Sequence, residues 1–183
     1  DRPLTEGDIR DLNRIILKEG FWRVAQTPGG EATRKWIEPG RYKTQPNHVL
    51  TATGEIFHFA APEETPARMA VLVQWLRAEM EMPSLDLPAL LARAHHEFIR
   101  IHPFDDGNGR VVRLLVNYLL LRVGLLPLVV KSRDRRRYLE VIAFADTGDL
   151  APLAEFMAEA LRWSLRLGLE AASRLVELES GGE

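Results

Sequence analysis

The densest group of chemically active side chains lies in one short stretch, from His102 to Arg110, which reads HPFDDGNGR. His102 is the only obvious base in the stretch, because imidazole can take up a proton near neutral pH. Asp106 is an acid placed among hydrogen-bond donors, and a carboxylate beside bound phosphates is a natural ligand for Mg²⁺. The stretch therefore combines a candidate base with a candidate metal ligand.

The second half of this stretch leads directly into a predicted helix. Gly107 and Gly109 allow unusual backbone angles and the close approach of a ligand. The free backbone N–H groups at the start of a helix bind anions. Arg110 and Arg113 lie about one turn apart on one face of that helix, and two guanidinium groups beside an anion cradle favour more than one phosphate. Each element alone also fits an ordinary turn or a structural histidine, but together they indicate phosphate chemistry.

Helices must position this stretch, since helical periodicity dominates the chain. Pro103 disfavours helical backbone at His102, so that the preceding helix is expected to end there. Caps and apolar spacing predict helices over residues 5–20, 65–80, 86–101, 110–123 and 134–147 and a long helix from residue 149. β-prone residues around Thr53–Gly54 predict one β-hairpin over residues 48–59. A movable flap and a structural edge ribbon fit this hairpin equally well. The expected fold is mainly α.

Composition narrows the class of protein. The 183 residues carry a formal net charge of -2 and no cysteine, so we expect a single domain over residues 1–179 with a disordered tail at 180–183. The balanced charge argues against nucleic acid as a partner. The absence of cysteine excludes disulfides and Cys-ligated zinc, and fits a cytoplasmic location. The longest apolar stretch is too short and too polar for a transmembrane helix, so we expect no membrane partner.

The HPFDDGNGR stretch matches the Fic family signature HPFx[D/E]GN[G/K]R at every fixed position. The segments LTEGDIRDLNRIIL, HEFIRIHPF and RRRYLEVIAFADTGDLAPLAEF also resemble bacterial Fic domains. The resemblance implies a Fic-type helical bundle with one β-hairpin flap. It also implies protein adenylyltransferase activity, in which AMP passes from ATP to a Ser, Thr or Tyr hydroxyl of a target protein.

The resemblance also implies a role for each site residue. His102 would be the catalytic general base, Asp106 would hold Mg²⁺, and Phe104 would anchor the loop in the core. The phosphate-binding residues would be Gly107, Asn108, Gly109, Arg110 and Arg113. Tyr138 matches a position that lines the adenine pocket, although a core aromatic is an equal interpretation. The hairpin at 48–59 would align the target by strand addition, and self-modification is a further expectation.

A pH dependence follows from the proposed base. His102 must be neutral to accept a proton, and the ordinary pKa of histidine is about 6.5. The sequence therefore predicts that activity falls as the pH drops below about 6.5.

Two alternatives to adenylyl transfer stay open. A Fic-fold enzyme could use another nucleotide or phosphodiester donor, or remove AMP. A non-catalytic regulatory module would only bind the nucleotide. Gly109 argues against kinase-like relatives, which have Lys at that position, and the intact His102 argues against a module that only binds.

Many Fic proteins are inhibited by a helix with the motif [S/T]xxxE[G/N], whose Glu pairs with the second arginine, here Arg113. Ser173 and Glu177 have this spacing, but Leu178 follows instead of Gly or Asn. The start LTEGDIRDL resembles the segment that follows such a helix, and the chain does not begin with Met. We therefore expect an upstream inhibitory helix that is absent from this chain, and constitutive activity of the chain itself.

Overall fold

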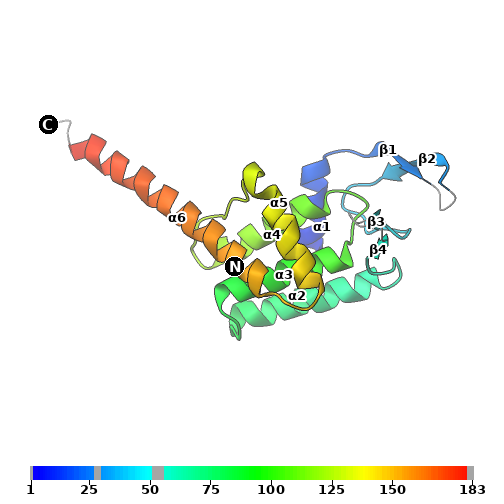
Figure 1. Ribbon diagram of the computed structural model, residues 1–183, viewed down its shortest axis with the longest axis horizontal. Helices are drawn as coiled ribbons and strands as arrows, with labels where there is room; N and C mark the ends of the chain where they lie inside the picture. The colour runs from blue at the N-terminus through cyan, green and yellow to red at the C-terminus, as the bar shows by residue number, and fades with distance from the viewer. Residues whose placement is uncertain (1, 27–29, 51–55, 181–183) are drawn as a thin grey trace. The chain divides into compact units, whose positions relative to one another are not determined.

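The computed structural model describes residues 2–26, 30–50 and 56–180 (Figure 1). Backbone contacts divide the chain into two compact units. The first contains Asp1–Pro83 and Glu97–Leu114, and the second contains Ser84–His96 and Leu115–Glu183. The division passes through two helices, α3 (Leu87–Ile101) and α4 (Asn108–Arg122). The single domain predicted over residues 1–179 stays a prediction.

The first unit begins with two of the predicted helices, α1 (Glu6–Leu17) and α2 (Thr65–Glu81). The predicted cap of α1 is confirmed: Thr5 and Asp8 form a reciprocal capping box, which satisfies two N–H groups that the helix leaves free. The helix ends earlier than Gly20, because Lys18 adopts a positive φ of 66° and its N–H bonds to the carbonyl of Arg14.

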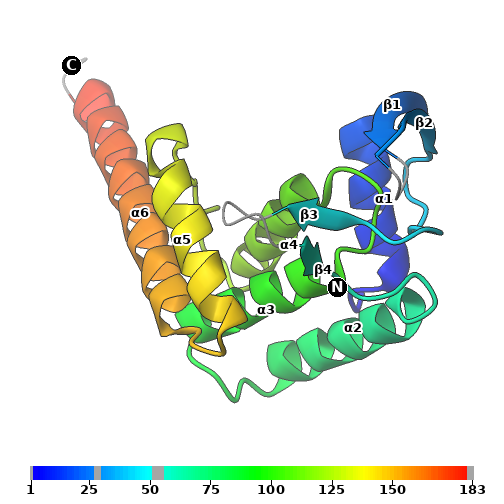
Figure 2. The same ribbon diagram turned by 45° about the vertical axis from the view of Figure 1, so that its right-hand side comes forward.

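The first unit also contains two antiparallel β-hairpins. Strands β3 (His48–Leu50) and β4 (Ile56–His58) form the predicted hairpin, whereas the Thr53–Gly54 turn lies outside the described residues. The expectation of a single hairpin was wrong. Strand β1 (Phe21–Gln26) pairs with β2 (Ala32–Ile37) in a further hairpin, which lies beside α1 in both ribbon views (Figures 1 and 2).

The second unit contains the remaining helices. A short 3₁₀ helix (Ser132–Asp134) precedes α5 (Arg135–Asp146), and α6 (Ala151–Ser180) follows. Helices α5 and α6 lie side by side (Figure 2). The predicted ends of α4 and α5 are confirmed by Gly124 and Gly148, which adopt positive φ values of 75° and 99°. Helix α6 continues to Ser180, and residues 181–183 of the predicted tail lie outside the described residues.

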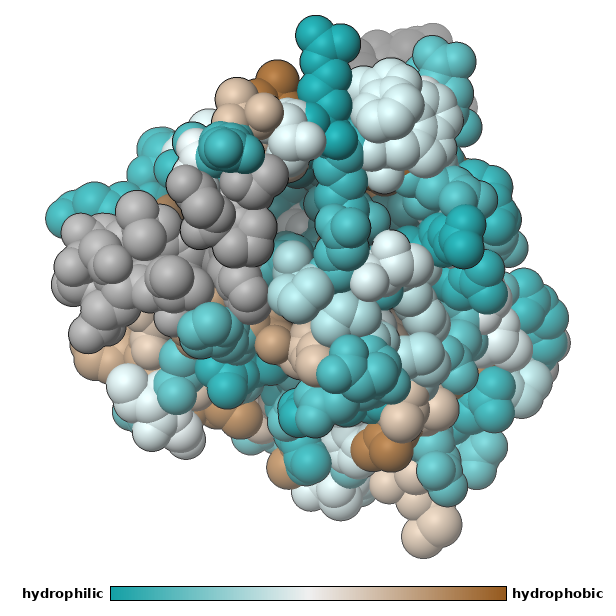
Figure 3. Space-filling view, turned by 90° about the vertical axis from the view of Figure 1, so that its right-hand side faces the viewer, coloured by the Kyte–Doolittle hydropathy of each residue, from teal (hydrophilic) through white to brown (hydrophobic). Residues whose placement is uncertain are grey.

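Each unit buries its own apolar side chains. Fully buried residues of the first unit come mainly from its helices and from the active loop (residues 102–110), and include Ile9, Met69, Leu76, Phe98 and Phe104, with Ile37 contributed by β2. By contrast, the face that carries the two hairpins is mostly hydrophilic (Figure 3). None of the helices described is both long enough and apolar enough to cross a membrane.

Candidate active site

A pocket of about 320 Å³ in the first unit brings the predicted loop residues together. Its wall is formed by the active loop, by the start of α4 and by one strand of the unforeseen hairpin. The lining residues are Arg23, His102, Asp105, Asp106, Gly107, Asn108, Gly109, Arg110 and Arg113. Most of these residues stand out in the sequence as candidate site residues, but Arg23 and Asp105 do not.

Asn108 holds the loop in its folded form. Its side chain is only 3% exposed, and its Oδ1 accepts from the backbone N–H of Phe104 at 2.9 Å while its Nδ2 donates to the Phe104 carbonyl at 2.7 Å. Since both polar atoms of its side chain form bonds within the loop, we expect Asn108 to offer its backbone N–H to an anion. Phe104 is 1% exposed and packs against the rings of Tyr42 and Phe98, as a loop anchor should.

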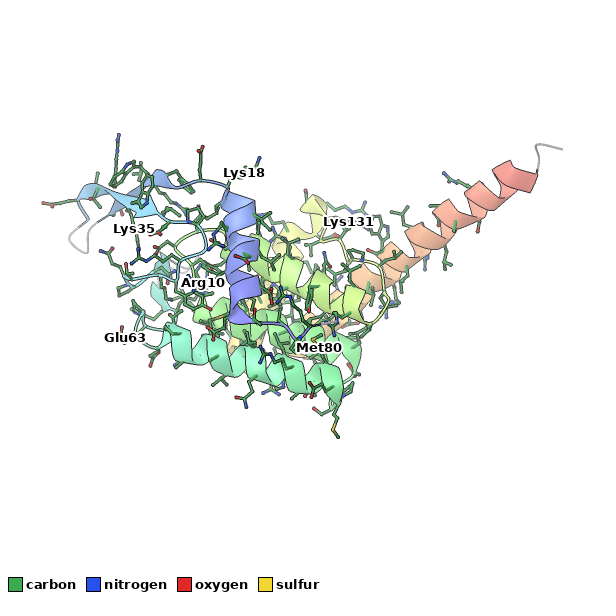
Figure 4. All side chains as sticks on the ribbon, turned by 180° about the vertical axis from the view of Figure 1, so that it is seen from behind. Arg10, Lys18, Lys35, Glu63, Met80 and Lys131 are labelled. Atoms are coloured by element: carbon green, nitrogen blue, oxygen red, sulfur yellow. The ribbon has the colours of Figure 1, made fainter. Side chains whose placement is uncertain are left out.

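Residues far away in the sequence brace the loop from outside. Asn13 on α1 is buried, donates to the Asp106 carbonyl at 2.9 Å and accepts from the Gly40 N–H at 2.8 Å. Lys43 is also buried, and its Nζ donates to the carbonyl of Ile101 at 3.0 Å and to Asn47 at 2.8 Å. Arg10 of α1 donates to the same Gly40 at its carbonyl (Figure 4).

His102 lies in a tightly defined position at the end of α3. Its N–H donates to the carbonyl of Phe98 at 2.9 Å, as in a last helical turn. Its φ of 50° then takes the chain out of the helix, which confirms the expected break before Pro103. The imidazole ring stacks on Phe59, with 3.9 Å between ring centroids and 19° between planes. Phe59 comes directly after β4, so the residue that follows the β3–β4 hairpin contacts the candidate base.

The surroundings of His102 lower its pKa to about 4. Burial is the main cause, because a low-dielectric environment disfavours the charged ring, and the ammonium of Lys43 adds repulsion. The Ile99 carbonyl and the Asp106 carboxylate favour protonation but do not overcome these effects, and Nδ1 makes no hydrogen bond of ordinary geometry with the described residues. The prediction that activity falls below about pH 6.5 therefore needs correction, because His102 of the free protein stays neutral well below that pH.

This depressed pKa has a measurable effect on stability. Between pH 6.5 and about pH 4 the unfolded chain binds a proton at His102 that the folded chain does not bind, so acid favours unfolding. We expect the free energy of unfolding to fall by about 2 kcal/mol more from pH 7 to pH 5 in the wild type than in His102→Asn. Urea unfolding of both proteins at the two pH values measures this difference. Parallel losses in the two proteins would show that His102 titrates normally.

The carboxylate of Asp106 contacts two arginines that line the pocket. Its Oδ1 accepts from the Gly107 N–H at 2.5 Å, and its Oδ2 lies 3.1 Å from Nη1 of Arg23. Arg110 is more distant, at 3.9 Å. Neighbouring Asp105 instead pairs with Lys35, whose Nζ donates to it at 2.6 Å from β2 (Figure 4). The two adjacent carboxylates therefore both contact the β1–β2 hairpin.

The start of α4 has the backbone geometry that the predicted anion cradle needs, while anion binding itself stays a prediction. Gly107 has a φ of 83°, a conformation that favours glycine, and a Cβ here would come within 3.0 Å of Asn13 Nδ2. The carbonyl of Gly107 accepts the N–H groups of Arg110 and Val111, so the N–H groups of residues 108 and 109 point toward the pocket end of the helix. Among the side chains that the structure describes, no carboxylate forms an ion pair with Arg113, which borders the pocket.

The chain offers no preformed metal cage within its described part, because no three His, Cys, Asp or Glu side chains there are grouped as metal ligands. Asp106 is a single carboxylate that borders the pocket, and about a quarter of its side chain is exposed. Such a site fits Mg²⁺, which commonly takes one or two carboxylates and completes its shell with water and substrate phosphates.

Tyr138 lies in the second unit and is a buried aromatic there, with 8% exposure. Its hydroxyl and Nε2 of His95 are 2.5 Å apart, and its ring packs against Phe156. These contacts fit the interpretation as a core aromatic, and a contact with a nucleotide stays a prediction. Ser173 is exposed on α6, while the side chain of Glu177 lies outside the described residues.

Known proteins are similar to this chain in sequence and in fold. The model of the Fic/DOC family matches residues 3–120. Among curated proteins, the chain is 40% identical over 176 residues to "Protein adenylyltransferase Fic" of Drosophila willistoni, an alignment that covers 94% of this chain and 30% of the relative. The chain therefore spans about a third of the length of the curated relatives that it matches.

Solved structures give the same result. A Fic domain containing signaling protein from Bacteroides thetaiotaomicron aligns with a TM-score of 0.82 and 41% identity, over 94% of this chain and 65% of that one. Fic-1 of C. elegans aligns with a TM-score of 0.72 and 27% identity, over 94% of this chain and 45% of that one. Since the relatives come from insects, a nematode and a bacterium, the similarity is not specifically bacterial.

Proposed function

Because the chain belongs to the Fic/DOC family, we propose that it is a protein adenylyltransferase, which transfers AMP from ATP to a Ser, Thr or Tyr hydroxyl of a target protein. One observation carries this proposal: the pocket places a buried, neutral imidazole beside a helix N-terminus and its arginines. The name "Protein adenylyltransferase Fic" of the curated relatives agrees with it.

His102 acts as the general base in the proposed reaction. The target hydroxyl oxygen bonds to the α-phosphorus of ATP, the bond from that phosphorus to the pyrophosphate oxygen breaks, and the hydroxyl proton passes to His102. Because Nδ1 is buried, Nε2 is the nitrogen that accepts the proton. Stacking on Phe59 fixes the ring plane, and a neutral ring is ready to accept a proton without first losing one.

The start of α4 binds the phosphates. Its free N–H groups and the positive end of its dipole face the developing negative charge, and this arrangement is in place before the substrate arrives. Arg110 and Arg113, which border the same pocket, neutralise the polyphosphate. Together these groups position the α-phosphorus for in-line attack.

Asp106 is the residue that would hold Mg²⁺. The bound ion would neutralise charge on the phosphates and on the leaving pyrophosphate. To offer its oxygens to the ion, the carboxylate must give up some of its contacts with the Gly107 N–H, Arg23 and Arg110. Asn13 fixes the backbone carbonyl of Asp106, so that this exchange needs only a side-chain rotation.

The β3–β4 hairpin is the proposed flap. Phe59 connects it to His102 through the ring stack, and Ala60 continues the connection by donating to the Arg100 carbonyl at 3.2 Å. A target segment that pairs with this hairpin by strand addition would therefore bring its hydroxyl beside the base. Self-modification is one case of the same reaction.

The test is transfer of label to protein. The chain is incubated with Mg²⁺ and ATP labelled at the α-phosphate, alone and with a cell lysate, and modified proteins are identified by mass spectrometry. We expect an added AMP on a hydroxyl side chain, and no label from ATP labelled at the γ-phosphate. Transfer from the γ-position, transfer only from another nucleotide or phosphodiester donor, or removal of AMP would replace the proposal by one of the alternatives. Nucleotide binding without any transfer would leave only a binding module.

A further inference from the structure

The β1–β2 hairpin has two chemically different faces. In its register Arg23 is directly opposite Lys35, and Trp22 is directly opposite Trp36. Successive side chains of a strand point to opposite faces, so the two basic residues share one face and the two tryptophans share the other. The indole rings pack edge to face, 5.4 Å apart.

The basic face is fixed to the active loop. The ion pair between Lys35 and Asp105 is short, and the two side chains are only 24% and 15% exposed. Arg23 pairs with Asp106, but its side chain is 56% exposed and borders the pocket. Lys35 therefore anchors the hairpin, whereas Arg23 has its guanidinium within reach of a ligand.

The charges around the pocket favour a ligand with several negative charges. Lys35 already neutralises Asp105. The remaining charged side chains at the wall are Arg23 and the two arginines of α4, against the single carboxylate of Asp106. Three guanidinium groups can form paired hydrogen bonds to several phosphate oxygens. A monophosphate would leave some of these donors unused.

Arg23 and a divalent cation would also both bind the carboxylate of Asp106. Arg23 occupies an oxygen of Asp106, and two cations that share one carboxylate repel each other at this short range. A polyphosphate removes the conflict, since the guanidinium can turn from the carboxylate to a phosphate oxygen. We propose that Arg23 is a polyphosphate-binding residue, which pairs with Asp106 in the free protein and with the β- and γ-phosphates in the nucleotide complex. Only the identity of the nucleotide rests on the proposed function.

Arg34 supplies a matched control. It lies on β2 opposite Val24, on the tryptophan face, and it is exposed and forms no ion pair with the described residues. Arg23→Gln and Arg34→Gln therefore remove the same charge from opposite faces of one hairpin. Isothermal titration of both variants and the wild type uses inorganic tripolyphosphate, ATP and AMP as probes, with far-UV CD melting to compare stability.

We expect Arg23→Gln to weaken the binding of tripolyphosphate and ATP at least tenfold and to leave AMP within about twofold. Arg34→Gln should change each affinity by less than about twofold, and Arg23→Lys should retain part of the tripolyphosphate affinity. In the absence of nucleotide, Arg23→Gln should bind Mn²⁺ several-fold more tightly in EPR titrations, because a competitor for Asp106 is gone. A merely structural role of Arg23 would not strengthen metal binding.

The inference is overturned if Arg23→Gln and Arg34→Gln bind tripolyphosphate equally well, if AMP weakens as much as ATP, or if the wild type does not bind tripolyphosphate. It can fail independently of the proposed function. AMP transfer by a wild type whose tripolyphosphate affinity does not depend on Arg23 removes the inference alone. Arg23-dependent binding of tripolyphosphate without any AMP transfer removes the adenylyltransferase proposal alone.

Discussion

Replacing His102 with alanine is expected to lower the rate of AMP transfer by about 10²–10⁴-fold, which is the usual contribution of a positioned general base. ATP affinity should change only a few-fold, because in the proposed complex α4 and its arginines, and not His102, bind the phosphates. The measurement compares single-turnover transfer from α-labelled ATP with calorimetric ATP affinity for the two proteins.

A second substitution at this position separates chemistry from folding. His102 has a positive φ, which alanine tolerates poorly and asparagine tolerates better. His102→Asn should be as inactive as His102→Ala but closer to the wild type in melting temperature. Residual transfer within tenfold of the wild type in both variants would exclude His102 as the base.

The pH dependence of the wild type gives a further check. The titration of His102 should not change kcat/KM for AMP transfer between pH 5 and pH 8, since its pKa lies near 4 in the free protein.

Replacing Phe104 with alanine should lower the free energy of unfolding by about 3–5 kcal/mol, the usual cost of deleting a fully buried phenyl ring. Phe104 is 1% exposed, and its ring fills the space between Tyr42 and Phe98. Its backbone also holds both polar atoms of Asn108, so collapse of the cavity would disturb the loop. Chemical denaturation followed by CD measures the stability, and AMP transfer should fall in parallel.

Phe144 offers the control for this prediction. It is 56% exposed on α5, and substitutions of exposed side chains usually change stability by about 0.5 kcal/mol or less. Phe144→Ala should therefore unfold close to the wild-type denaturant midpoint. If Phe104→Ala lost less than about 1 kcal/mol, the loop would depend on its hydrogen bonds and not on the ring.

The sequence predicted those parts of the fold that depend on local signals. The helices have apolar stripes, and several have recognisable ends such as the Thr5 cap and Gly124, while the loop residues are contiguous. The β1–β2 hairpin lacked such a signal, because only Ile37 among the residues of its two strands is buried. Its basic face depends on carboxylates about 70 residues further along the chain. Thr27–Pro28–Gly29–Gly30 between two β-prone segments was the one local hint.

The electrostatics of the site were also beyond sequence reasoning. The pKa of His102 depends on its burial and on Lys43, and neither follows from the motif. Asn13 is a similar case: it reads as an ordinary polar residue of a helix, but it is buried and braces the loop. Local motifs therefore pointed to the candidate reacting groups, while tertiary contacts determine the burial and the charge environment of those groups.

The distant braces of the loop have a consequence for folding during synthesis. The contacts from Asn47 to His102, from Lys43 to Ile101 and from Asn13 to Asp106 close segments of 55, 58 and 93 residues. Closing segments of this length costs chain entropy before the contacts form. On the ribosome, the bracing residues emerge first and have no partner until the loop itself has left the exit tunnel. The braced loop at residues 102–110 is therefore expected to form late, and a nascent chain that ends before it has bracing residues without their partners.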